Sequence, residues 1–228
     1  AADYAVVSAE RRYRLPAAAD PVAAVAALHP AATAFLGLHR RARIRAGDTV
    51  LVGGAAGSIG SCAVQFAAAA GCRVIATARP GDHDRCRRLG AAAGADYRDP
   101  DLAGRVLAVA PGGVDLHWDT SGHGHLATAI ELVRPGGHIL ITAGREPQPP
   151  TALWPLYTRD VTVTGFVISR ATVADLADAA GALNARLAAG GFPVQVADVL
   201  PLERTAGAHA RVEAGQRGRI VVQVAQPR

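Results

Sequence analysis

The residues whose types and spacing best suit chemistry lie in the stretch VLVGGAAGSIGSC, residues 50–62. A short apolar run ends there in glycine and alanine, and an alanine-rich segment with helical periodicity follows. Gly57 would let the backbone approach a pyrophosphate, and Gly60 would let the helix lie close to the strand. Ala55 occupies the first glycine slot. The pattern predicts a dinucleotide-binding loop with its anion at the helix N-terminus, the alternative being a glycine turn that only packs the helix on the strand.

The end of the next predicted strand indicates which dinucleotide would bind. A site for NAD usually has an acidic residue there to accept the ribose hydroxyls, but the sequence IATARPGDH has no acid before Asp82. Arg79 stands where a guanidinium could grip a 2′-phosphate. The sequence therefore favours NADP(H) over NAD(H), the alternative being that Arg79 is a solvated loop residue.

Other chemistry-bearing residues give no metal or nucleophile site. His123 and His125 have no carboxylate or cysteine partner at ligand spacing, so they are expected in a loop and at a helix start. Ser121 has no nearby histidine oriented by an acid, which argues against a hydrolase triad. Asp119 is expected to cap the turn that follows it rather than to act as a base. The sequence identifies no catalytic residue.

From residue 49 onward, short apolar runs alternate with longer periodic segments. This alternation is typical of a parallel sheet with crossover helices, and it predicts the α/β class with a doubly wound Rossmann sheet of about six strands. The predicted strands are 49–53, 73–77, 95–97, 114–118, 138–142 and 161–167. The predicted helices between them are 58–70, 83–89, 102–109 and 126–133. The RPGG sequence at 134–137 is expected to stop a helix and form a turn.

The two ends of the chain have a different pattern. Residues 2–16 alternate like two short strands, which could not bury a face alone and would need a partner sheet. A helix is predicted over 23–38, interrupted at His29 and Pro30. A long amphipathic helix is predicted over 172–189, and the tail beyond it as strand, helix and strand.

Composition excludes several classes of protein. The chain has 228 residues, 50% of them hydrophobic, and a net charge of +5. All of its 24 basic residues are arginine and they are scattered, which argues against a nucleic-acid-binding face. No apolar segment reaches the roughly 20 residues of a membrane span, and the three cysteines resemble buried thiols in a reducing compartment. A soluble cytoplasmic protein is expected. The absence of methionine indicates that a leading residue was removed or that the sequence continues upstream.

Five motifs occur in order: the glycine loop, LGA followed by GADYRD, VDLHWDTSG, LVRPGGHILITAG and GRIVVQV. With them the chain resembles the zeta-crystallin-like quinone oxidoreductase and enoyl reductase branch of the medium-chain dehydrogenase/reductase superfamily. The resemblance implies a Rossmann domain at 28–191, with remnants of a GroES-like catalytic domain at 1–27 and 192–228. Most of the family's N-terminal catalytic domain would then be missing, and no zinc-ligand set of the alcohol dehydrogenase branch is present.

The resemblance also implies a function and a set of cofactor contacts. The activity would be zinc-independent, NADPH-dependent hydride transfer to a quinone or to an activated alkene (enone or enoyl), with the chain acting as a cytoplasmic homodimer paired through residues 161–168. The alternative is a non-catalytic NADP(H)-binding module, acting as a partner or scaffold subunit. The implied cofactor-binding residues are Thr33, Ala56, Gly57, Ser58, Ile59, Gly60, Arg79, Tyr97, Ser121, Gly122, Ala143, Gly144, Phe166, Val167, Ile168 and Arg219.

One position departs from the family pattern. The lysine that the family usually has in the adenosine loop falls here on Asp82 or His83. Either Arg79 has taken over the phosphate, or the preference for NADP is reduced, since a carboxylate beside a phosphate would repel it.

Overall fold

The computed structural model describes residues 5–144, 147 and 149–224. It divides into two compact units, one made of Ala1–Ala32 with Arg170–Arg228 and the other of Thr33–Ser169. The sequence predicts domain boundaries after residues 27 and 191, whereas the two compact units meet after Ala32 and Ser169. The predicted domain boundaries stay a prediction. Each unit is described by itself.

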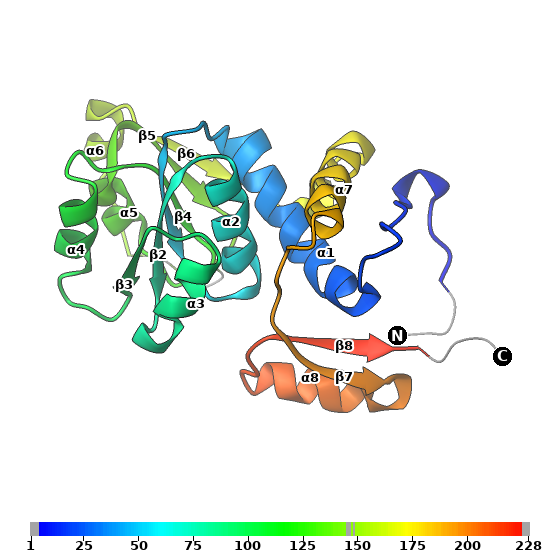
Figure 1. The fold of residues 1–228 in the computed structure, drawn as a ribbon. Helices are drawn as coiled ribbons and strands as arrows, with labels where there is room; N and C mark the ends of the chain where they lie inside the picture. The colour runs from blue at the N-terminus through cyan, green and yellow to red at the C-terminus, as the bar shows by residue number, and fades with distance from the viewer. Residues whose placement is uncertain (1–4, 145–146, 148, 225–228) are drawn as a thin grey trace. The chain divides into compact units, whose positions relative to one another are not determined.

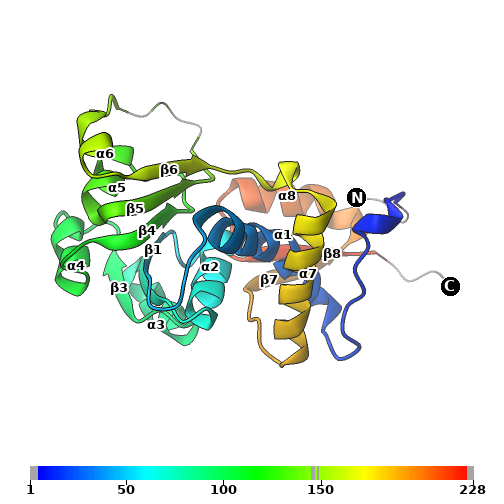
Figure 2. The ribbon, with the colours of Figure 1, turned by 90° about the horizontal axis from the view of Figure 1, so that it is seen from above.

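The unit Thr33–Ser169 is built on a six-stranded sheet in the order β3-β2-β1-β4-β5-β6. Every pairing in it is parallel, so the predicted doubly wound sheet is confirmed. β3 and β6 form its two edges (Figures 1 and 2). The strands are β1 (Thr49–Gly53), β2 (Arg73–Ala78), β3 (Ala93–Asp96), β4 (Val114–Asp119), β5 (Val133–Ile141) and β6 (Thr162–Gly165).

Helices cover both faces of this sheet. α2 and α3 lie on one face, and α4 and α5 on the other (Figure 1). In β1 successive side chains are buried on alternate faces, since Val50 and Val52 are fully buried and Leu51 belongs to the apolar cluster beneath α4 and α5. The helices are α2 (Ser58–Ala69), α3 (His83–Arg88), α4 (Leu102–Val109), α5 (Leu126–Leu132) and α6 (Trp154–Thr158).

Trp118 of β4 is the largest fully buried side chain on the α2 face. Its indole N–H donates to the Thr142 hydroxyl at 2.9 Å, and Gly37 packs so closely that a Cβ there would lie 2.6 Å from the ring. The indole therefore fixes the distance between the sheet and the helix that carries Gly37.

Trp118→Phe should lower the free energy of unfolding by about 1–3 kcal/mol, because it removes ring volume and leaves Thr142 without its donor. Chemical denaturation followed by circular dichroism would measure this change. Trp154→Phe is the matched control, since Trp154 is 62% exposed, and we expect a change there under about 0.5 kcal/mol. Equal effects of the two substitutions would contradict this account of the core.

The RPGG sequence does not form the predicted turn. α5 ends at Leu132, and the four residues lie inside β5, where the register with β4 shifts between Val114 and Leu116. Gly136 has a φ of +70°, and its N–H donates to the Arg159 carbonyl at 2.8 Å. The glycine absorbs an irregularity within the strand, so the chain does not leave the sheet.

The first helix differs from both expectations made for it. α1 (Pro21–Phe35) runs through Pro30 without interruption and continues as a π-helix, η2 (Leu36–Ala42). The 22 residues Pro21–Ala42 have a mean hydropathy of 1.5 and are long and apolar enough to cross a membrane, so the expectation that no such segment exists is wrong. Because 56% of its apolar window is buried, as in the core helix of a soluble protein, this is weak evidence for a span.

The predicted N-terminal strands are also absent from the part that the structure describes. Residues 5–20 hold a 3-10 turn, η1 (Ala9–Arg11), and no strand, and Val6 is fully exposed. Two short strands without a partner sheet have nothing to pair with or pack on. Instead, the Arg14 carbonyl accepts from the Asn184 side chain at 2.8 Å.

The C-terminal part of the unit made of Ala1–Ala32 with Arg170–Arg228 follows the prediction. α7 (Val173–Ala188) begins with a capping box formed by Thr172 and Asp175. Beyond it β7 (Val196–Pro201) and β8 (Arg219–Gln223) pair in parallel, joined by α8 (Thr205–Glu213), so the predicted strand, helix and strand are confirmed. Three 3-10 turns complete the elements, η3 (Pro80–Asp82), η4 (Ile168–Arg170) and η5 (Leu202–Arg204).

Candidate functional site

The glycine loop connects the end of β1 to the start of α2. Gly54 has a φ of +66°, and its carbonyl accepts from the Gly57 N–H at 2.8 Å, which closes a tight turn. A Cβ on Gly60 would lie 2.2 Å from the Gly54 carbonyl oxygen, so this position requires glycine. The N–H groups of the first turn of α2, from Ser58 on, have no carbonyl partner within the helix and suit an anion such as a pyrophosphate.

A side chain from α3 holds this loop. The guanidinium of Arg85 donates from Nη1 to the Ala56 carbonyl at 2.8 Å. The contact joins residues 29 positions apart, and an arginine in a helix that ends in several arginines gives no sequence signal for it. Arg85 thus fixes a carbonyl of the loop and adds a positive charge near its donors.

We expect Arg85→Met to weaken NADPH binding roughly tenfold, because the Ala56 carbonyl loses its donor and the loop loses a nearby charge. Arg88→Met, on the same helix, is the matched control and should leave the affinity unchanged. Fluorescence titration with NADPH would measure both, and equal affinities of the two variants would contradict a positioning role for Arg85.

Arg79 and Tyr97 meet at the ends of two neighbouring strands. Ala78, the last residue of β2, pairs with Asp96, the last residue of β3. Arg79 and Tyr97 are the next residues in the sequence after each of them. Arg79 Nε donates to the Tyr97 hydroxyl at 3.2 Å, and this hydrogen bond lowers the pKa of Tyr97. The guanidinium of Arg98 lies 5.4 Å from the centre of the Tyr97 ring. Two residues singled out separately in the sequence therefore form one exposed cationic group.

The two residues at the family's lysine position lie beside this pair. Asp82 ends η3, and its charge contributes, after the hydrogen bond to Tyr97, to raising the pKa of Arg79. The imidazole of His83 lies 3.1 Å from the Ala78 carbonyl through Nε2. At the family's lysine position this chain therefore has an acid or a histidine, and the arginine that directly follows β2 is Arg79.

Asp119 organises the loop after β4. One carboxylate oxygen accepts from the N–H and hydroxyl of Ser121, and the other from the N–H groups of Gly122 and Gly124 at 3.0 and 2.8 Å. Burial acts to raise the pKa of Asp119, but these hydrogen bonds and His117 hold it below its usual value. The predicted capping role is confirmed.

The loops after β1, β4 and β5 abut one another. Thr120 donates its N–H and its hydroxyl to the Gly53 carbonyl at 3.0 and 2.8 Å. Gly122 has a φ of +81°, and a Cβ on it would lie 2.9 Å from the Gly144 nitrogen. The structure therefore brings Ser121, Gly122, Ala143 and Gly144 together beside the glycine loop. They lie at the carboxyl edge of the sheet, where the connections after β1 and β4 leave toward α2 and α5 on opposite faces.

The remaining predicted cofactor residues lie in several elements. Thr33 is in α1 and is buried. Phe166 follows β6, where its N–H donates to the Ile141 carbonyl and Arg41 lies 5.5 Å from its ring centre. Val167 is exposed, and Ile168 begins η4. Arg219 begins β8, in the other unit. Their contacts with a cofactor stay predictions.

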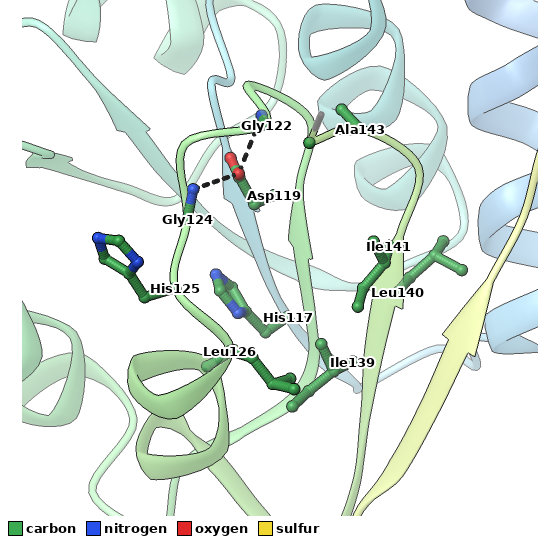
Figure 3. A pocket seen from close by; sticks show the side chains of 12 residues that line it. His117, Asp119, Gly122, Gly124, His125, Leu126, Ile139, Leu140, Ile141 and Ala143 are labelled. Carbon is green, nitrogen blue, oxygen red and sulfur yellow. Dashed lines mark hydrogen bonds between the residues drawn. The ribbon is translucent and has the colours of Figure 1, made fainter. Parts of the chain in front are cut away.

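A pocket of about 140 Å³ opens beneath the Asp119–Gly124 loop, at the carboxyl ends of β4 and β5 (Figure 3). His117 lines it and is only 9% exposed. Its Nδ1 atom is buried and has no hydrogen-bond partner among the described residues. Burial lowers the pKa of His117 to about 4, although Asp119 acts to raise it. The imidazole is therefore neutral at pH 7, and no local sequence pattern indicates its environment.

The buried imidazole should make stability depend on pH. The unfolded chain binds a proton on His117 near pH 6.5 and the folded chain only near pH 4, so stability is lost as the pH falls between these values. His117→Phe should reduce the loss of unfolding free energy between pH 7 and 4.5 by about 2 kcal/mol. Denaturant titrations across this range would test it, with the exposed His123→Phe as control. The same loss in His117→Phe and the unmodified protein would contradict the assignment.

Comparison with known proteins agrees with this geometry. Residues 58–183, more than half of the chain, match the family profile described as zinc-binding dehydrogenase. The chain belongs to this family. A quinone oxidoreductase from Sus scrofa is 27% identical over 97% of the chain and 68% of its own length. The trans-enoyl reductase tazE from Aspergillus terreus is 37% identical over 50% of the chain and 40% of its own length. The resemblance seen in the motifs is confirmed.

A solved relative shows the same fold. The structure of mycobacterial Rv1454c complexed with NADPH aligns with a TM-score of 0.80 at 25% identity, over 92% of this chain and 66% of the mycobacterial chain. The chain thus spans about two thirds of the length of the mycobacterial protein and of the porcine quinone oxidoreductase.

The zinc in the family's description does not fit the residues present. Among residues 5–144, 147 and 149–224, no group of three or more histidine, cysteine, aspartate or glutamate side chains could hold a metal ion. Cys62, Cys72 and Cys86 are buried, as predicted. No step of the chemistry proposed below is routed through zinc.

Proposed function

We propose that this member of the family described as zinc-binding dehydrogenase is itself zinc-independent. Its proposed activity is NADPH-dependent reduction of a quinone or of an activated alkene of the enone or enoyl type. The observation that carries the proposal is the contact of Arg79 with Tyr97 at the ends of β2 and β3. It supplies a cation and a hydroxyl where the ribose 2′-position of a dinucleotide held by the glycine loop would lie.

The chain's residues would bind and orient the cofactor. The N–H groups of Ser58 and Ile59 would receive the pyrophosphate, with Arg85 holding the loop through Ala56. The loops of Ser121, Gly122, Ala143 and Gly144 would contact the nicotinamide half. When bound, the reduced nicotinamide supplies a hydride, and a proton from water completes the reduction. The protein's part is then binding and orientation of the reactants.

The relatives support this proposal through the names they carry. One is a quinone oxidoreductase, another is a trans-enoyl reductase, and a third was solved with NADPH. Both acceptor classes take hydride without a metal, because a carbonyl conjugated to the accepting carbon spreads the negative charge that develops.

Oxidation of NADPH followed at its nicotinamide absorbance tests the function. We expect turnover with a 1,4-benzoquinone or an α,β-unsaturated ketone and much less with NADH as donor. NADPH binding without turnover of any acceptor would overturn the catalytic claim and support an NADP(H)-binding module. Failure to bind NADPH would overturn both.

We propose further that two copies pair through β6. This strand is a sheet edge of four residues with Val163 38% exposed, and nearby α6 exposes Trp154 and Tyr157 by 62% and 72%. Such an edge is normally covered. Sedimentation should show a dimer that Val163→Pro dissociates, and a monomer at all concentrations would remove this proposal. The three buried cysteines fit a cytoplasmic location for the dimer.

A further inference from the structure

Two arginine side chains act on the hydroxyl of Tyr97 at the end of β3. Arg79 donates from Nε to this hydroxyl at 3.2 Å, and the guanidinium carbon of Arg98 lies 5.4 Å from the centre of the Tyr97 ring. The hydrogen bond from Arg79 is the main cause that lowers the pKa of Tyr97, and the hydrogen bonding and charge of Arg98 lower it further. Both cations therefore favour negative charge at the same oxygen.

The charge of Arg79 is partly offset by a neighbouring acid. Asp82 ends η3, and its charge is one of the causes that raise the pKa of Arg79, after the contributions of Tyr97. A phosphate monoester carries a charge of about −1.5 to −2 at pH 7. Because Asp82 opposes Arg79, these two side chains together would not neutralise such a group. A strong preference for a 2′-phosphate here requires a second cation.

The guanidinium of Arg98 meets this requirement. Its nearest acids along the chain bind other groups, since Asp96 accepts from the Arg98 backbone N–H at 3.0 Å and Asp99 accepts from Arg105 Nε at 3.2 Å. Within the part of the chain that the structure describes, no carboxylate lies within ion-pair distance of the Arg98 guanidinium. Arg98 and Tyr97 are both exposed, so a ligand can reach them.

We infer that Arg98 binds the 2′-phosphate directly and, together with Arg79, determines the preference for NADP(H). This role rests on the proposed function, since it takes the glycine loop and the ends of β2 and β3 as the cofactor site. A planar guanidinium offers donors that match phosphate oxygens in pairs. Arg98 thereby restores, from the neighbouring strand, the positive charge that is missing where the family's lysine position falls on Asp82 or His83. The alternative is that Arg98 only stacks on the Tyr97 ring and holds it in place.

Calorimetric titration of the full chain with 2′-phospho-ADP-ribose and with ADP-ribose tests this role. The two probes differ only in the 2′-phosphate, and neither carries the nicotinamide. Arg98→Met should weaken binding of 2′-phospho-ADP-ribose roughly tenfold and leave binding of ADP-ribose unchanged. Arg98→Lys keeps the charge without the planar donors, so it should lose only about threefold. Arg73→Met, at the opposite end of β2, is the matched control and should change neither affinity.

A second background separates direct contact from support of the tyrosine. Tyr97→Leu removes both the ring and the hydroxyl through which Arg98 could act indirectly. Adding Arg98→Met to Tyr97→Leu should still weaken binding of 2′-phospho-ADP-ribose several-fold, by roughly the factor seen in the unmodified chain. If the loss occurs only in chains that retain Tyr97, Arg98 merely positions the ring, and direct binding of the phosphate is overturned.

Two further results would overturn the role of Arg98, and they differ in what else fails. Equal binding of 2′-phospho-ADP-ribose by the unmodified chain and by Arg98→Met would remove Arg98 from the site and leave the proposed function in place. No binding of either probe by the unmodified chain would overturn the cofactor site and the proposed function with it. The two failures are therefore distinguishable in one set of titrations.

Discussion

Gly60→Val is expected to abolish measurable NADPH binding, with a loss of affinity on the order of 100-fold or more. An added Cβ would lie 2.2 Å from the Gly54 carbonyl oxygen and 2.8 Å from the Ala55 Cα, and both contacts are to backbone. Neither can move easily, because Gly54 accepts from Gly57 and the Ala55 N–H donates to the Thr77 carbonyl at 3.1 Å. α2 would shift away from β1, and its N–H groups would no longer surround the pyrophosphate.

Isothermal titration calorimetry with NADPH measures this effect. Gly181→Val in α7 is the matched control, because a Cβ on Gly181 meets nothing within 4 Å, and its affinity should equal that of the unmodified protein. Circular dichroism would establish that the Gly60→Val variant still folds. A folded Gly60→Val variant that binds NADPH normally would contradict the assignment of the loop.

Arg79→Glu is the second substitution with a large expected effect. It places a carboxylate where we propose that the 2′-phosphate binds, and it removes the donor of the Tyr97 hydroxyl. Affinity for NADPH should fall roughly 100-fold, while affinity for NADH should change by less than about threefold, since NADH has no phosphate there. The preference between the two cofactors would be lost or reversed.

Calorimetric titration of both cofactors separates a specific from a general effect. Arg73→Glu is the matched control, because Arg73 begins β2 at the opposite end of the strand and the charge change is identical. It should leave the ratio of the two affinities unchanged. If Arg79→Glu weakens NADPH and NADH equally, Arg79 does not read the phosphate, and the preference assigned to it is wrong.

The sheet could be predicted because its strands have local signals. The sequence predicts β1 at 49–53, where it is found, since three buried apolar residues stand between Asp48 and the glycine loop. It likewise predicts α4 at 102–109, because the apolar residues there recur with helical spacing. The capping role of Asp119 also followed from its position after a strand, and the hydrogen bonds to Ser121, Gly122 and Gly124 bear it out.

The errors arose where distant residues override local preference. The Gly136 N–H finds its acceptor in Arg159, so RPGG stays within β5 although the sequence reads as a turn. Pro30 is tolerated within α1, and the residues after that helix continue as a π-helix. The contact of Arg85 with Ala56 and the buried environment of His117 exist only once the strands are side by side. No local pattern in the sequence carries such information.

Calorimetric titration of the unmodified chain with NADPH and with NADH tests the central claim most directly. The pairing of Arg79 with Tyr97 beside the glycine loop predicts one site per chain and binding of NADPH at least roughly tenfold tighter than NADH. Equal affinities, tighter binding of NADH, or no heat of binding with either cofactor would contradict it.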